Sequence, residues 1–392
     1  MIASLMAINA LAIDVMLPGM QEIGASLGEP DENKRQLIIT AYLLGFSVMQ
    51  LVFGPLSDRF GRRGPLAVGV GVYVLAAVGA IFVPTFAPLL GLRFIQGMGA
   101  AATRVIAVAI VRDVFGGRQM AEIMSVVMTV FMVMPVIAPS LGQGIMLFGE
   151  WHLVFVFMAV IAAAILVWMW IRLPETLKHE NRRPLTLTSV ATGFKVVMTN
   201  RISLWYTLAM AIVMGALFGF INSAQQIYVG IYGLGVWFPV VFALVAGLMS
   251  IASFANSKLV MKYGMRRMSH SALIGFILVS SMLAICATFG AVPFAVFLTL
   301  FAMAMIFFGM IGSNLTSIAM EPLGALAGTA SSVQGFIQTM FGAVAGALIG
   351  QAFDGTVFPI SLGFALLGIS ATGCVLIAEK GKLFGTGASA PA

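Results

Sequence analysis

Hydrophobic runs of about 20 residues, separated by short polar connections, follow one another along nearly the whole chain. Roughly 20 apolar residues are needed for an α-helix to cross the hydrocarbon core of a bilayer. Breaks at charged residues, Gly and Pro predict twelve membrane spans, which lie at 2–25, 37–56, 64–83, 88–111, 122–148, 152–172, 203–228, 235–256, 268–288, 291–314, 323–350 and 357–378. The pattern therefore predicts an all-α integral membrane protein.

The longest polar stretch divides these spans into two groups of six. We expect residues 1–173 and 203–392 to form two six-helix halves, joined by a cytoplasmic linker at 174–202 that runs along the membrane surface. The charged residues of this linker are Glu175, Lys178, Glu180, Arg182, Arg183, Lys195 and Arg201.

An internal repeat relates the two halves. The loop after the second span, 54–63, has a degraded copy after the eighth span, 258–267, in which Arg59-Phe60-Gly61 aligns with Lys262-Tyr263-Gly264. Related six-span halves predict pseudo-twofold symmetry, with a substrate path between the halves near the bilayer midplane.

Composition excludes several other classes of protein. Hydrophobic residues make up 60% of the 392 residues and charged residues 9%, whereas ordinary soluble domains carry about 25% charged residues. The net charge of +7 is scattered between spans and forms no patch for nucleic acid. Cys286 and Cys374 lie inside apolar runs and have neither disulfide nor metal spacing.

The distribution of basic residues predicts the orientation. Lys34 and Arg35 follow the first span and Arg93 and Arg104 lie inside the fourth, while all the other Lys and Arg residues lie on the opposite side of the membrane. By the positive-inside rule that side is the cytoplasm, so both termini are expected to be cytoplasmic. All five tryptophans lie near predicted span ends, as an aromatic belt requires.

Two ionisable residues inside spans are the main functional candidates. Asp14 interrupts the first apolar run, which we therefore expect to be a span rather than a cleaved signal peptide. Arg93 lies at a similar predicted depth, and an interaction with Asp14, direct or through water, would be broken when Asp14 takes up a proton. The alternatives are a hydrated Asp14 at a helix that ends at Pro18, and an Arg93 that snorkels or holds a kinked backbone.

A few other polar residues inside spans outline a mostly apolar cavity. Each of them could instead form an interhelical hydrogen bond. The candidates are Asn9, Arg104, Asn222, Gln225, Asn314, Gln334 and Gln338. In the fifth span, Pro135, Pro139 and Gly142 are expected to permit bending or close packing, while Gly342, Gly346 and Gly350 form a packing stripe in the eleventh.

The chain resembles the major facilitator superfamily, and within it the Bcr/CflA branch of drug/proton antiporters. The resemblance is carried by the loop Gly54-Pro-Leu-Ser-Asp-Arg-Phe-Gly-Arg-Arg63 and by strings in the first, fourth and fifth spans and after the tenth. Those strings are 13–18, 93–101, 110–113, 138–142, 319–322 and 327–332.

This resemblance implies roles for several residues. Asp14 would carry the transported proton and Arg93 would tune it. Gly54, Asp58, Arg59, Gly61 and Arg62 would form a cytoplasmic latch, and Pro135, Pro139 and Gly142 would belong to the antiporter motif. Met6 stands where some exporters of cationic drugs have a second acid, which favours neutral or zwitterionic substrates such as phenicols.

The sequence thus predicts a monomeric, proton-coupled multidrug efflux antiporter of the bacterial inner membrane, working by alternating access. It would export small amphipathic or neutral antibiotics, phenicol- or bicyclomycin-like, with the proton motive force and no cofactor or metal. A proton-coupled transporter of one metabolite, working in either direction, is the alternative. An enzyme is not expected, because His152, His179 and His270 lie at span ends or in loops and no catalytic motif is present.

Overall fold

The computed structural model describes residues 1–115, 117–177, 180, 182 and 187–385, and the elements in these ranges are helices. The chain divides into two compact units, Met1–Thr192 and Gly193–Ala392. The dividing point falls within helix α9 (Leu187–Thr199), inside the expected linker, and part of that linker lies outside the described residues.

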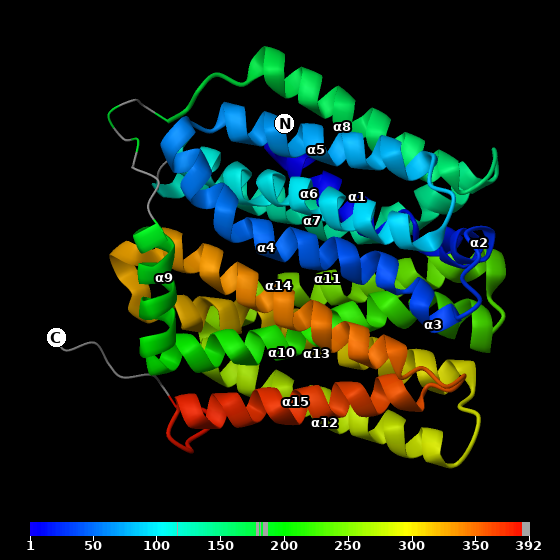
Figure 1. Cartoon of the computed structure of the whole chain (residues 1–392). Coiled ribbons are helices and arrows are strands. Elements are labelled where there is room, and N and C mark those ends of the chain that lie inside the picture. Colours follow the sequence, from blue (N-terminus) through cyan, green and yellow to red (C-terminus); the bar gives the residue numbers. More distant parts are fainter. Residues whose placement is uncertain (116, 178–179, 181, 183–186, 386–392) are drawn as a thin grey trace. The chain divides into compact units, whose positions relative to one another are not determined.

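In the described part of unit 1, helices α1 to α8 and the short turn η1 precede α9, and Figure 1 labels the α-helices. These elements are α1 (Ile2–Asp14), η1 (Leu17–Gly19), α2 (Met20–Ser26), α3 (Glu32–Arg35), α4 (Leu37–Phe60), α5 (Arg63–Ile81), α6 (Phe86–Val114), α7 (Gly117–Met146) and α8 (His152–Arg172).

Unit 2 repeats this series of long helices after α9. Its elements are α10 (Arg201–Gln225), η3 (Gln226–Ile231), η4 (Gly235–Trp237), α11 (Phe238–Tyr263), α12 (Met265–Thr288), α13 (Phe294–Met320), η5 (Glu321–Leu326), α14 (Ala327–Gln351) and α15 (Phe358–Ala378).

The predicted membrane spans are confirmed as helices. In the described part of the chain, eleven helices are long and apolar enough to cross a bilayer, and a shorter apolar helix, Val133–Met146, lies within α7. Together they occupy the twelve predicted positions. The first span is not one continuous helix, since α1 and α2 are separated by the short turn η1.

The helices pack in the same order in both units. In unit 1, α6 contacts α4 and α5, α5 contacts α8, and α1 contacts α7; in unit 2, α13 contacts α11 and α12, α12 contacts α15, and α10 contacts α14. Each unit therefore builds the same six-helix scheme, as the internal repeat predicts.

Glycine permits the closest approaches in these pairs. A methyl group on Gly97 of α6 would collide with the backbone carbonyl of Tyr42 in α4. In α14, Gly342 and Gly346 lie against Met214 and Phe218 of α10. Small residues have this role where lipid supplies no hydrophobic drive between helices, so the glycine stripe of α14 is a packing surface.

Candidate functional site

Asp14 lies where the first membrane span breaks. It is the last residue of α1, and Pro18 follows in η1; proline has no N–H with which to continue the helical hydrogen-bond ladder. The side chain of Asp14 is 3% exposed, and its Oδ1 atom has no hydrogen-bond partner among the described residues. A buried carboxyl oxygen left free in this way is unusual for a purely structural residue.

Arg93 of α6 is fully buried and holds the end of α1. Its Nη2 donates to the carbonyl of Ala12 at 2.8 Å, in the last turn before the break. The last carbonyls of a helix have no partner within the helix, and a cation there also interacts favourably with the helix dipole. Arg93 thus caps the segment that carries Asp14.

No ion pair joins Asp14 and Arg93 within the described ranges, so the direct form of the expected contact is absent. The guanidinium is already engaged: Nη1 donates to Gln96 Oε1 at 2.5 Å and Nε to the Ile38 carbonyl at 3.4 Å. Its carbon lies 4.6 Å from the centroid of the Tyr42 ring. Holding a broken backbone, the alternative raised for Arg93, is what the geometry shows.

Tyr42 and Gln96 are part of this cluster and were not predicted. The Tyr42 hydroxyl donates to Asn9 Oδ1 at 2.7 Å, which ties the predicted cavity residue Asn9 to α4. Gln96 follows Arg93 by three residues, a spacing that places both on one face of α6 and could have been noticed. Nothing in the sequence near Tyr42 signals its role.

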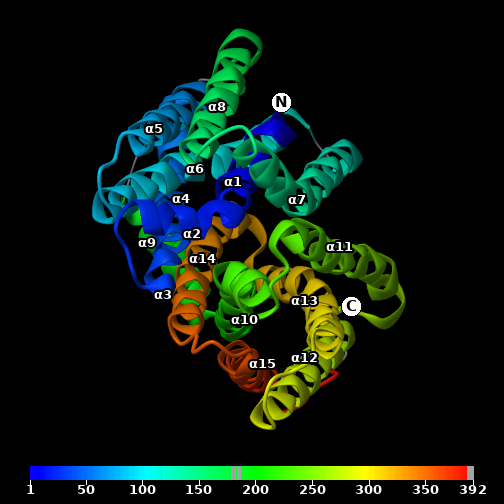
Figure 2. The same ribbon diagram turned by 90° about the vertical axis from the view of Figure 1, so that its right-hand side faces the viewer.

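The predicted antiporter motif lies against the same break. Pro135 and Pro139 lie within α7, which stays helical through both, and Gly142 packs against Val15, the residue after Asp14. Figure 2 shows α7 beside α1, in agreement with their contacts. A methyl group on Gly142 would collide with the Val15 carbonyl, so this position requires glycine for close approach.

Arg104 lies further along α6 and is separate from this cluster. Its side chain is exposed, and it forms no hydrogen bond or ion pair with any other residue that the structure describes. A cation left open on a membrane-spanning helix is free to meet a ligand or solvent.

The predicted polar residues of unit 2 fall into two groups. Asn314 donates to Asn256 Oδ1 at 2.9 Å, and Gln334 donates to the Ala319 carbonyl at 3.3 Å and to Ser203 at 3.4 Å. These two residues link helices, the alternative raised for each of them. Asn256 was not predicted.

The second group retains unused hydrogen-bonding capacity. Both amide atoms of Asn222, Oε1 of Gln225 and Nε2 of Gln338 are buried without a partner among the described residues. Directly after Gln225, α10 passes into the π-helical turn η3, and such turns occur frequently at functional sites. Asn222 and Gln225 are therefore the better ligand candidates of unit 2.

The signature loop of unit 1 is built around Arg62, which is 2% exposed. Arg62 donates to Asp58 at 2.6 Å and, through Nε, to Asp113 of α6 at 2.7 Å. Gly61 ends α4 at φ 92°, a conformation that favours glycine. Arg59 is exposed and has no hydrogen bond or ion pair with another residue in the described ranges, and the Gly54 carbonyl accepts a hydrogen bond from the Ser57 hydroxyl.

Glu175 completes the loop from beyond α8 and was not predicted as a site residue. Its carboxylate accepts the backbone N–H groups of Arg62 at 2.8 Å, Leu177 at 3.0 Å and Arg63 at 3.3 Å. Burial alone would raise the pKa of Glu175, but these donors outweigh it and hold the pKa below its ordinary value.

In the described part of the chain, no group of three or more His, Cys, Asp or Glu side chains is placed to hold a metal ion. The candidate features are the break after Asp14 and the π-helical turn after Gln225, both with unpaired polar groups, and the charged loop that follows α4. This arrangement suits the binding and movement of small solutes.

Comparison with known proteins identifies the family. The family model described as Major Facilitator Superfamily matches residues 2–348. The chain belongs to the major facilitator superfamily. It is a multi-pass membrane transporter of small molecules, and the family consists of transporters rather than enzymes.

Curated relatives cover most of this member of the superfamily. The bicyclomycin resistance protein homolog of Haemophilus influenzae is 32% identical over 89% of this chain and 87% of its own. The uncharacterized MFS-type transporter YdgK of Bacillus subtilis is 30% identical over the same shares, and the chloramphenicol resistance protein of Pseudomonas aeruginosa is 28% identical over 87% of this chain and 79% of its own.

Solved structures agree on the fold alone. The xylose transporter XylE of E. coli superposes with a TM-score of 0.74 at 13% identity, covering 100% of this chain and 98% of that chain. The human organic anion transporter MFSD10 gives 0.69 at 16% identity, covering 96% and 97%.

Proposed function

We propose that this protein is a proton-coupled drug efflux antiporter of the bacterial inner membrane, with both termini in the cytoplasm. The observation that carries the proposal is Asp14: a buried carboxyl group at the end of a broken membrane helix, with one oxygen free of any described partner. A group of this kind is able to take up a proton without first breaking an ion pair.

The surroundings of Asp14 give proton uptake a route to conformational change. Arg93 anchors the carbonyl of Ala12, and Gly142 seats α7 against Val15, so Asp14 lies between two points where α1 is held. Neutralising the carboxylate changes the electrostatic field at both points. Alternating access by rocking of the two halves is the expected response.

The driving force is sufficient for export. Moving one proton charge inward releases about 2.3 kcal/mol per 100 mV of membrane potential. At about 1.4 kcal/mol for each tenfold ratio, one proton sustains a concentration ratio of tens for a neutral solute.

For the substrate we propose small, neutral or zwitterionic antibiotics. Two of the relatives are named for resistance to bicyclomycin and chloramphenicol. Within α1, Met6 is a buried apolar side chain, so Asp14 is the acid of that helix. In unit 1, the single carboxylate of α1 favours a ligand without a net positive charge. In unit 2, the unpartnered amide atoms of Asn222 and the Oε1 atom of Gln225 fit a ligand with several hydrogen-bonding groups.

The test is drug-driven proton movement in inverted membrane vesicles. Phenicols, sulfonamides, bicyclic antibiotics and cationic dyes are added after a pH gradient has formed, for the wild type, for Asp14→Asn and for the control Asp354→Asn, whose aspartate lies in an exposed loop. Neutral antibiotics should dissipate the gradient in the wild type and the control but not in Asp14→Asn.

Two results would contradict the proposal in different ways. Dissipation by Asp14→Asn at the wild-type rate places the proton site elsewhere. Failure of every drug in the wild type, with the protein folded, replaces drug export by transport of a dedicated metabolite.

A further inference from the structure

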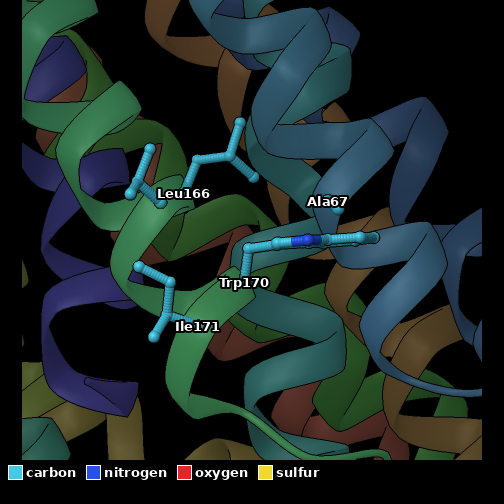
Figure 3. A pocket seen from close by; sticks show the side chains of 5 residues that line it. Ala67, Leu166, Trp170 and Ile171 are labelled. Atoms are coloured by element: carbon cyan, nitrogen blue, oxygen red, sulfur yellow. The ribbon is translucent and has the colours of Figure 1, made fainter.

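An apolar groove opens on the face of unit 1 between α5 and α8. It has a volume of about 340 Å³ and is lined by Ala67 of α5 and by Leu166, Val167, Trp170 and Ile171 of α8. In Figure 3, Trp170 reaches from α8 across to α5, where Ala67 lies. Both helices are long and apolar enough to span the membrane, and Val167, Trp170 and Ile171 are exposed, so we expect the groove to face lipid acyl chains.

The groove lies at the membrane end that carries the signature loop. Trp170 is 54% exposed and belongs to the last turn of α8, which ends at Arg172, and Ala67 belongs to the first turns of α5. Trp side chains prefer the boundary between acyl chains and headgroups. A molecule in the groove would therefore have its apolar part beside α8 and its polar part level with the loop.

A guanidinium stands at that polar end. Arg63, the first residue of α5, lies with its guanidinium carbon 4.3 Å from the Trp170 ring centroid and donates an N–H to the Trp170 carbonyl. Its Nε is buried and has no hydrogen-bond partner among the described residues. The nearby carboxylate of Glu175 is taken up by backbone N–H groups, so the charge of Arg63 has no ion-pair partner in the described ranges.

We propose that this groove binds an anionic glycerophospholipid from the surrounding leaflet. One acyl chain lies along Leu166, Val167 and Ala67, and the phosphate accepts hydrogen bonds from the terminal N–H groups of the Arg63 guanidinium. Arg–phosphate pairs are strong because the planar guanidinium presents several donors at once. Arg172, the last residue of α8, is a second exposed cation two residues after Trp170.

The headgroup must be anionic rather than zwitterionic. A choline headgroup carries its own cation, which competes with Arg63 for the phosphate, whereas a glycerol headgroup leaves the phosphate charge available. Basic clusters beside membrane helices select anionic lipids on this ground. The contact between Arg63 and Trp170 also fastens α5 to α8 without any lipid, so the experiment must separate a fastening role from a lipid site.

Trp170 provides the probe. A protein that retains Trp170 as its only tryptophan, with the other four replaced by Phe, is reconstituted with phosphatidylglycerol or phosphatidylcholine brominated on the acyl chains, and tryptophan quenching is measured. The matched control retains Trp168 instead, which is also exposed on α8 but lies outside the groove lining.

At equal mole fraction we expect the anionic lipid to quench Trp170 about fivefold more effectively, the effect of one basic contact at a membrane surface. Trp168 should be quenched equally by the two lipids. Arg63→Gln should abolish the preference, and Ala67→Phe, which fills the groove and leaves Arg63 in place, should weaken quenching by both lipids.

Equal quenching of Trp170 by the two lipids would overturn the proposal. So would a preference that persists in Arg63→Gln, because the proposal assigns the selection of the anionic headgroup to the charge of Arg63, or undiminished quenching in Ala67→Phe, because that variant fills the groove. If Arg63→Gln fails to fold, Ala67→Phe decides the question by itself.

Discussion

The loops that join α4 to α5 and α11 to α12 have a similar backbone conformation but different charged residues. Both helices end at a glycine with positive φ, 92° at Gly61 and 81° at Gly264, and the next helix begins within two residues. In unit 1 the loop contains its own ion pair, between Asp58 and Arg62 four residues later. In unit 2 both positions are methionine, Met261 and Met265, and Met261 is 87% exposed.

Unit 2 rebuilds the network from more distant acids. Arg266 donates to Glu379, after α15, at 2.7 Å and to Glu321, after α13, at 3.1 Å. Asp113 and Glu175 occupy the corresponding ends of α6 and α8 in unit 1. Both units therefore have the glycine and the acids at the helix ends. They differ in the loop arginine that donates to these acids, which is Arg62 in unit 1 and Arg266 in unit 2.

A further set of contacts in unit 2 involves the segment after α15. Tyr206 donates to Glu379 at 2.9 Å, and the backbone N–H of Phe384 donates to His270 Nδ1 at 3.0 Å. Because Nδ1 accepts, the proton of a neutral His270 is on Nε2, where it is donated to the Tyr206 hydroxyl at 3.0 Å. Unit 2 thus fastens the segment after α15 onto its own charge network.

The largest expected difference comes from the two arginines. Arg62→Gln leaves Asp58 and Asp113 without their shared buried cation and should lower the unfolding free energy by about 4 kcal/mol. Arg266→Gln removes a more exposed cation and should cost about 2 kcal/mol. Thermal unfolding in detergent checks both, and equal losses would show that burial of the arginine does not distinguish the loops.

The glycines should differ next. Gly264→Ala has space for its methyl group and suffers backbone strain alone, about 2 kcal/mol. Gly61→Ala carries the same strain and also displaces the Glu175 carboxylate, which adds about 1 kcal/mol. The same unfolding assay measures both variants. Equal losses for the two variants would mean that Glu175 moves aside without cost.

A double-mutant cycle tests whether the local pair can be transplanted. The coupling energy between Asp58 and Arg62 should be about 1 kcal/mol, since Asp58 is partly exposed. Met261→Asp with Met265→Arg recreates the i, i+4 spacing on an exposed surface and should couple by about 0.3 kcal/mol. Similar values in the two units would contradict the assignment of the difference to burial.

The smallest effect concerns Glu175. Because its folded pKa is lowered, its contribution is fully present above the ordinary pKa of about 4.3 and is lost as the pH falls through the lower folded value. Glu175→Gln should cost about 0.5 kcal/mol at neutral pH, because the side chain is exposed. The cost should vanish in acid. A cost that grew on acidification would mean that the folded pKa of Glu175 is raised rather than lowered.

Long apolar runs made the helices of this fold predictable, because the bilayer fixes their length. The break after Asp14 was foreseen only as one of two alternatives at Pro18, since proline either ends or kinks a helix depending on its neighbours. The side-chain partners were harder. Arg93 was placed near Asp14 by depth alone, and depth does not reveal that the Ala12 carbonyl lies closer.

The acids that complete the charged loops show the same limit. Asp113 and Glu175 are far from Arg62 in sequence, and only the order of helix packing brings the ends of α6 and α8 to the end of α4. Asn314 of α13 likewise forms a hydrogen bond with Asn256 of α11, and the pattern along a single helix does not predict such a pair. Sequence located the ionisable and polar residues; tertiary contacts decided which of them remain free.

The seating of Gly142 against the Val15 carbonyl has a genetic consequence. A larger residue at position 142 must displace the backbone at Val15, next to Asp14. The substitution in α7 therefore distorts the end of α1, which lies far away in the sequence. Revertants of a Gly142→Ala strain, selected for regained transport, should therefore carry second changes in the first membrane span, near Val15 and Met16, rather than elsewhere in α7.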